Sequence, residues 1–216
     1  MTDDHEEVDN YRLQLEQKLE MDPKDVNSLV LLGVLAFEYY HESDHALSLF
    51  KQAILLDPLN VDVKFWLSMC LFYDYLFYEE AEKFVKEALI INSNDPRCLS
   101  LMARIIRDND GSAEEGIDYV KKAILHSPDW PMLRYQLAEF FLSLGDIEKA
   151  ELEFEKMMEM KSLDPHIIKN EVDKYYETIV TGRTWDKKKK SSSHLLQRIL
   201  EAKQKKIKKD YYESSS

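Results

Sequence analysis

The sequence has 216 residues, among which Gly and Pro are scarce, with 5 and 6 copies. This length can bury one sizeable core, and so few Gly and Pro favour an all-helical chain with short connections. No segment approaches ~18 apolar residues without a charge, and the first residues are acidic, so neither a membrane-spanning helix nor a signal peptide is expected. We therefore expect a soluble, cytoplasmic protein, in which Cys70 and Cys98 remain reduced thiols.

The formal charge of −12 is unevenly distributed along the chain. Residues 183–216 contain 11 Lys and Arg against 4 Asp and Glu, a balance of +7, which leaves −19 for residues 1–182. Because affinity for phosphate requires a positive surface, this acidic body argues against nucleic-acid binding by residues 1–182.

Small residues recur along the sequence at an interval of 35. The pair Leu32-Gly33 recurs as Leu67-Ser68, Met102-Ala103 and Leu137-Ala138. A second series is Ala46, Ala81, Gly116 and Ala150, and a third is Ala53, Ala88, Ala123 and Met157. One residue is lost in the last copy. A fixed period of this length predicts a solenoid, in which each unit buries its apolar face against its neighbours.

The predicted elements follow this period in chain order. A capping helix is predicted over residues 6–21, because its apolar residues precede equivalent residues of the first repeat by 35. The first repeat opens at Asp25, a favourable N-cap. Four helix-turn-helix repeats are predicted at about 25–58, 60–93, 95–128 and 130–163, followed by a second capping helix at 164–181 and a basic, mobile or helical tail at 182–216.

These repeats resemble the tetratricopeptide repeat (TPR), whose pattern has a small-residue pair in helix A, Ala and an aromatic residue in helix B, and a terminal Pro. Leu32-Gly33, Ala46, Phe50, Ala53 and Pro58 match this pattern in the first repeat. The resemblance implies an all-α fold, an α-solenoid of about four repeats over residues 6–181. Two departures are visible: the first three copies have one extra residue between the small positions of helices A and B, and no Trp stands early in helix A.

In TPR proteins, ligands bind the concave groove that helices A line. Carried over to this sequence, the resemblance implies that the groove combines apolar and aromatic residues with three arginines. The candidate partner-binding residues are Val34, Phe37, Phe65, Met69, Phe72, Tyr73, Arg97, Arg104, Arg107 and Tyr135. The competing explanations are ordinary core between repeats for Val34, Phe37, Met69 and Phe72, and pairing with surface acids for the arginines.

Members that bind chaperone tails hold two carboxylates with Lys and Asn at fixed positions. Here Val34 follows Gly33 where that Asn would stand, which argues against this clamp. A pentatricopeptide protein, whose repeats read RNA bases, would have a similar period. The acidic body argues against it.

Two short motifs suggest metal sites but are better explained as turns. Residues 41–45 match the zinc pattern H-E-x-x-H, yet the repeat places them between helices, with Ser43 or Asp44 as the N-cap, and offers no third ligand. Residues 108–111 resemble part of a calcium loop, but Ile106 and Ile117 would occupy its first and last positions. We therefore expect no metal, no cofactor and no enzymatic activity.

The sequence thus predicts a non-catalytic interaction module, an adaptor, scaffold or chaperone that binds a peptide or helix, including one with acidic groups. The alternative is a protein recruited to RNA or to a membrane surface through its lysine-rich tail. The partner of the tail could also be the acidic body itself.

Overall fold

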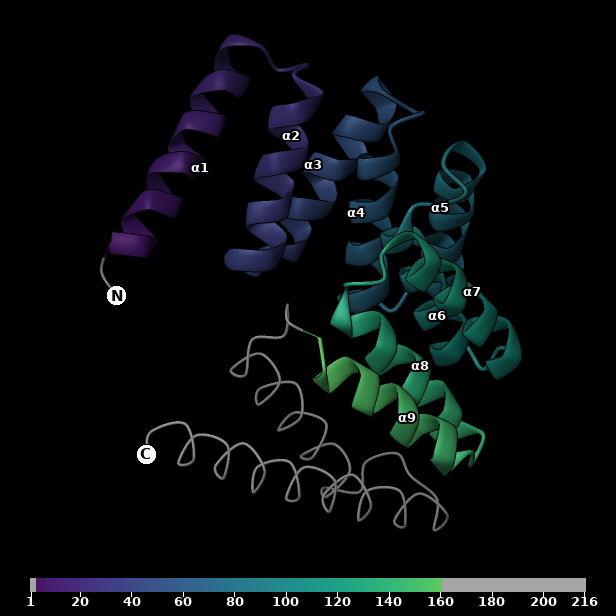
Figure 1. The fold of residues 1–216 in the computed structure, drawn as a ribbon. Helices are drawn as coiled ribbons and strands as arrows, with labels where there is room; N and C mark the ends of the chain where they lie inside the picture. The colour runs from purple at the N-terminus through teal and green to yellow at the C-terminus, as the bar shows by residue number, and fades with distance from the viewer. Residues whose placement is uncertain (1–2, 161–216) are drawn as a thin grey trace, which may run out of the picture. The chain divides into compact units, whose positions relative to one another are not determined.

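The computed structural model describes residues 3–160, and these residues form helices joined by short turns (Figure 1). The chain divides into two compact units, an N-terminal unit of residues 1–126 and a C-terminal unit of residues 127–216, and we describe each by itself. The helices are α1 (Asp3–Met21), α2 (Val26–Val34), the π-helical η1 (Leu35–Tyr39), α3 (Ser43–Leu56), α4 (Val61–Tyr73), α5 (Tyr78–Ile91), α6 (Pro96–Asp108), α7 (Ala113–His126), α8 (Pro131–Ser143) and α9 (Ile147–Met158). The expected all-α fold of helix-turn-helix repeats is confirmed, whereas the predicted helix 164–181 and the tail 182–216 lie outside the described residues.

Side-chain caps start the first helix of each pair in the N-terminal unit. The Asp25 carboxylate accepts from the backbone N–H of Asn27, and Asn60 and Asp95 cap α4 and α6 in the same way. Such caps satisfy N–H groups that have no partner within the helix, and each stabilises its helix by about 1 kcal/mol. Since the three caps are 35 residues apart, every A helix of this unit begins at the same point of the repeat.

The A helices end in left-handed turns, where the extra residue is also accommodated. His41, Leu76, Asp110 and Gly145 have positive φ angles of 56°, 54°, 54° and 76°. In the first two pairs, the N–H after the left-handed residue donates to a carbonyl six residues earlier; in the last two pairs, it donates to one five residues earlier.

The sequence predicted Ser43 or Asp44 as the N-cap of the following helix, but α3 begins at Ser43 and its N-cap is Glu42. The extra residue of the first pair lengthens the end of helix A, which forms the π-helical segment η1.

Small residues bring the two helices of a pair close together. A Cβ atom on Gly33 would lie 2.6 Å from a ring carbon of Phe50, which is fully buried on α3. Ala46 and Ala53 on α3, and Ala81 and Ala88 on α5, are also fully buried. The aromatic ring of Phe50 therefore occupies the space that Gly33 leaves.

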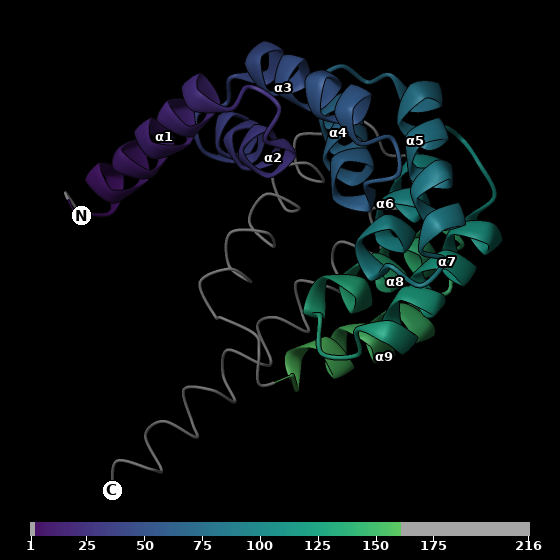
Figure 2. The same cartoon turned by 90° about the horizontal axis from the view of Figure 1, so that it is seen from above.

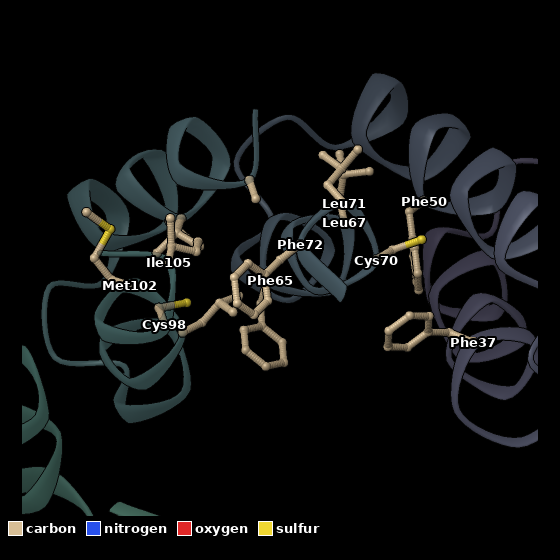
Figure 3. Close-up of a cluster of buried hydrophobic side chains, with 14 of the residues drawn as sticks. Phe37, Phe50, Phe65, Leu67, Cys70, Leu71, Phe72, Cys98, Met102 and Ile105 are labelled. Atoms are coloured by element: carbon tan, nitrogen blue, oxygen red, sulfur yellow. The ribbon is translucent and has the colours of Figure 1, made fainter. Parts of the chain in front are cut away.

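The core of the N-terminal unit extends across several helix pairs. One cluster joins Phe37 and Phe50 to residues of α4, α5 and α6, including Cys70, Cys98 and Ile105. Figure 3 shows that Leu67 and Leu71 point to one side of α4, whereas Phe65 and Phe72 point to the other. Helix α4 is consequently buried on two faces, between its partner α5 and the neighbouring pairs.

A charged residue occupies the position of the missing Trp in two pairs. In the pattern W-x-x-L-G that position is four residues before the Gly, and here it holds Leu29, Lys64, Leu99 and Arg134. The Lys64 side chain is 6% exposed, and its Nζ lies 2.5 Å from Glu87 Oε2 on α5. In the C-terminal unit, Arg134 donates to Glu153 on α9 in the same way, at 2.8 Å. A buried charge needs such a partner, so these ion pairs stand where other repeats use apolar packing.

The described part of the C-terminal unit is one helix pair. Ala138 and Leu142 on α8 pack against Ala150, Phe154 and Met157 on α9. This core uses the same small positions as the other pairs.

A hydrogen bond between tyrosine and aspartate recurs between neighbouring pairs. The Tyr40 hydroxyl donates to Asp9 on α1 at 2.5 Å, and 35 residues later the Tyr75 hydroxyl donates to Asp44 on α3. The residues 35 positions further along the sequence, Asp110 and Glu79, include no Tyr, so the bond has no third copy at these positions. Two successive junctions therefore share a bond that the sequence analysis did not anticipate.

We predict that Gly33→Ala destabilises the protein, although Ala is the better helix former. The added methyl group would press on the Phe50 ring, and overpacking of this kind costs about 1–3 kcal/mol, against a gain of about 1 kcal/mol in helix propensity. Urea denaturation would measure the difference. Phe50→Leu should recover stability in the Gly33→Ala background, and a gain of stability in the single variant would contradict the close contact.

We also predict that the Tyr–Asp bonds lose their effect in alkali. Hydrogen bonding to Asp9 raises the pKa of Tyr40 to about 12, and bonding to Asp44 raises the pKa of Tyr75 to about 12. Since an unfolded Tyr titrates near pH ~10, the contribution is complete below about pH 10 and is lost as the pH rises to about 12. The variant Tyr40→Phe, Tyr75→Phe should be less stable than wild type at about pH 9, by about 0.5 kcal/mol or more for each bond. That difference should shrink at about pH 11; a constant difference would show that the hydroxyls act in another way.

Candidate functional site

Helices α2, α4 and α6 line one side of the N-terminal unit. Figure 2 shows them inside the row formed by α3, α5 and α7, and α2 contacts α4 as α4 contacts α6. The A helices are therefore the elements whose outward residues share the inner face of this unit, where the sequence analysis placed the groove.

An accessible strip runs along these three helices. On α4, Asp62, Trp66, Met69 and Tyr73 follow the spacing i, i+4, i+7, i+11, so they share one helix face, and each is at least partly exposed. The same positions are exposed or partly exposed on the other two helices, with the exception of the buried Leu101. We call this set the inner strip: Asn27, Leu31 and Val34 on α2, Glu38 on η1, the four residues named on α4, and Arg97, Arg104 and Asp108 on α6.

Three of the predicted groove residues lie beneath this strip. The side chains of Phe37, Phe65 and Phe72 are only 9%, 7% and 3% exposed, because they pack in the core between helix pairs. For Phe37 and Phe72 this is the arrangement that the competing explanation expected. Their rings support the strip from below, whereas Val34, Met69 and Tyr73 remain accessible.

The three predicted arginines differ in their partners. Arg97 Nη2 lies 2.7 Å from Asp62 and 2.8 Å from Asp95, and these hydrogen bonds, that to Asp95 foremost, raise the guanidinium pKa. Arg107 donates to Asp108 at 2.8 Å. Both side chains thus pair with surface acids, so their charge is largely compensated.

Arg104 stands at the centre of the α6 part of the strip in a different environment. Its guanidinium lies 5.9 Å from the ring centroid of Tyr73 and donates to the hydroxyl of the same residue. Both contacts are with Tyr73, whose side chain is uncharged, whereas Arg97 and Arg107 contact carboxylates. Arg104 is therefore the arginine of this strip best placed to receive a carboxylate.

Sequence reasoning missed two apolar side chains of the strip, Leu31 and Trp66. Leu31 is 43% exposed, and Trp66, which is partly exposed, makes edge-to-face contacts with Phe37 and Phe65 at centroid distances of 6.5 and 5.1 Å. The sequence already placed both on the strip face, since each lies four residues after one strip residue and three residues before another. Tyr135, by contrast, belongs to the C-terminal unit, where it packs edge-on against Phe154.

A hollow lies at the turns that connect helices A and B. It has a volume of ≈ 530 Å³ and is lined by the H-E-x-x-H residues, His41, Glu42, Ser43, Asp44 and His45, together with Asp74 and Tyr75. The Glu42 carboxylate accepts two bonds from Arg12, at 3.0 and 3.1 Å, and one from His45, which lower its pKa in that order. These polar groups already bind one another, since Ser43 donates to Asp74 and Tyr75 to Asp44.

The described residues contain no cluster of His, Cys, Asp and Glu that could hold a metal ion. In the H-E-x-x-H segment, His41 precedes α3 in a left-handed conformation, so the two histidines do not share one helix. Burial raises the pKa of the Cys70 and Cys98 thiols to about 12, which suppresses the reactive thiolate. Within residues 3–160, no helix is long and apolar enough to cross a membrane.

Comparison with protein-family models finds no match, and comparison with curated proteins finds none either. Solved structures do resemble this chain. The thermophilic TPR protein TTC0263 of Thermus thermophilus superimposes with a TM-score of 0.66 at 19% identity, over 78% of this chain and 91% of that one. For PilF of Pseudomonas aeruginosa the TM-score is 0.65 at 16% identity, over 91% and 86% of the two chains.

A third similar structure is YrrB, described as a TPR protein with an unusual peptide-binding site. Its TM-score is 0.57 at 16% identity, over 80% of this chain and 86% of that one. At such identities the similarity concerns the fold. Together with the period of 35 residues and the small residues at the helix contacts, it shows that this chain has the TPR-like fold, an α-solenoid of helix-turn-helix repeats.

Proposed function

We propose that the protein is a non-catalytic interaction module that binds a peptide or helix of a partner protein along the inner strip of its N-terminal unit. The observation that carries this proposal is the composition of the strip. It presents accessible apolar and aromatic side chains on α2 and α4. Beside them, on α6, lies Arg104, which contacts the uncharged side chain of Tyr73.

The apolar part of the strip would supply most of the affinity. Leu31, Val34, Trp66 and Met69 leave accessible surface beside one another on two contacting helices. Trp is among the commonest hot-spot residues of interfaces, and a flexible Met adapts to different partner side chains. The buried Phe37 and Phe65 rings hold the Trp66 indole in position, so less side-chain freedom is lost on binding.

The polar part would determine the direction of the bound segment. Arg104 can hold a carboxylate bidentately, and its neighbour Tyr73 offers a hydroxyl and an exposed ring. Arg97, whose charge Asp62 and Asp95 compensate, would contribute less. We therefore expect a partner segment with apolar anchors at one end and an acidic residue at the other.

The fold supports this assignment because solenoids present extended surfaces for binding. The similar YrrB is described as having a peptide-binding site, and a site of that general kind is what we propose here. An adaptor or scaffold would hold such a segment while another surface contacts a second molecule. A chaperone would release it to another protein.

We predict that peptides selected from a random phage-displayed library on the full chain bind the strip. Trp66→Ala should weaken binding of a selected peptide by about 2 kcal/mol, or about thirtyfold, at all salt concentrations, because it removes a buried hot spot. Leu31→Ser should weaken it with less effect on the core. Arg104→Gln should weaken it and reduce its salt dependence, since a charge pair is lost. Fluorescence anisotropy would measure each affinity.

The matched control is Leu13→Ala on α1, which changes an exposed Leu outside the strip and should leave affinity unchanged. Circular dichroism must show that each variant remains folded. Wild-type affinity in Trp66→Ala, Leu31→Ser and Arg104→Gln would place the binding site elsewhere.

A further inference from the structure

Five residues of the inner strip are charged, and three of them pair with a group of opposite charge. The paired residues are Asp62, Arg97 and Asp108. The other two are Glu38 and Arg104. Within residues 3–160, no hydrogen bond or ion pair joins either of these two side chains to a group of opposite charge. The strip therefore presents one carboxylate and one guanidinium whose charges the protein leaves uncompensated.

These two groups lie at opposite ends of the strip. Glu38 is exposed on η1, which directly follows α2, whereas Arg104 lies on α6. Helix α4 separates them, since α2 contacts α4 and α4 contacts α6 (Figure 2). The axes of contacting helices are 8–10 Å apart, so two such steps place the charges about 20 Å from each other. Because charges are screened beyond about 8 Å at physiological salt, neither neutralises the other.

The accessible surface between the two charges is apolar. Leu31 and Val34 on α2 and Trp66 and Met69 on α4 provide it. A segment that crosses the strip from α2 to α6 would thus meet a carboxylate, then apolar side chains, then a guanidinium. Opposite charges across an interface attract and like charges repel, so this order of groups determines the direction in which a charged segment binds.

We infer that the inner strip selects a dipolar segment, with a Lys or Arg before its apolar anchors and an Asp or Glu after them. The basic residue meets Glu38, and the acidic residue meets Arg104. In an extended segment these two residues would be about six positions apart, and in a helix about 13. The inference rests on the proposed function, because it requires a segment bound to the strip, and adds the basic end and a fixed direction.

The contribution of Glu38 should appear as selectivity more than as affinity. An exposed ion pair stabilises a complex by at most about 1 kcal/mol, because water and salt screen it. A like charge at the same place costs more, since both charges lose water without gaining a partner. Reversal of the Glu38 charge is therefore a sharper test than its removal.

Selection of random phage-displayed peptides on the full chain tests this inference. Peptides selected on wild type should carry a basic residue at one end and an acidic residue at the other. Peptides selected on Glu38→Lys should replace the basic residue by an acidic one and keep the apolar anchors. In fluorescence anisotropy, wild type should bind a peptide selected on it about tenfold more tightly than the analogue in which Glu replaces the basic residue, whereas Glu38→Lys should prefer the analogue.

The matched control is Glu20→Lys, which changes the net charge equally at an exposed residue of α1 outside the strip. It should select and prefer the same peptides as wild type, and circular dichroism should show that both variants are folded. A wild-type pool without the basic end, or the wild-type preference in Glu38→Lys, would overturn the inference. If Trp66→Ala weakens binding in that case, the proposed function still holds. If Trp66→Ala also binds as wild type does, both fail.

Discussion

The contact between paired helices at their small residues determines the remaining geometry of this protein. Where Gly33 faces the Phe50 ring, the space between the helices is so narrow that even one methyl group would collide. The same close approach recurs with a period of 35 residues, at alanines that are fully buried. Because each helix is held at short distance from its partner, residues on the opposite faces occupy equivalent places in every pair. The inner strip is a consequence of that regularity.

The inner strip depends on the core beneath it. It rests on buried aromatic rings, and the Trp66 side chain is held in place by Phe37 and Phe65. A rigid surface of this kind suits a partner with a defined shape, because little side-chain freedom is lost on binding.

The period predicted the helix pairs, the cap at Asp25 and the positions of the small residues, because these features depend on local spacing and on a distance that every copy shares. It did not predict which groove residues are accessible. Phe65 and Phe72 had the correct spacing for the groove, but the neighbouring pairs bury them, and burial depends on how several helices pack. Likewise, a Lys in helix A gave no sign that Glu87 of the next helix would neutralise it. The left-handed turns at His41 and Leu76 escaped prediction because neither residue is a Gly.

The Tyr–Asp bonds join two of the three junctions of the N-terminal unit, and the third is joined in another way. Tyr40 and Tyr75 link the first two junctions at the edge farthest from the caps. Helix α6 is instead linked to α4 along the inner strip, where Arg97 pairs with Asp62 and Arg104 donates to Tyr73. A ligand whose carboxylate replaces the Tyr73 hydroxyl on Arg104 would therefore remove one of the links between α6 and α4. Binding at the strip would thus alter the third junction, whereas the first two junctions would keep their bonds.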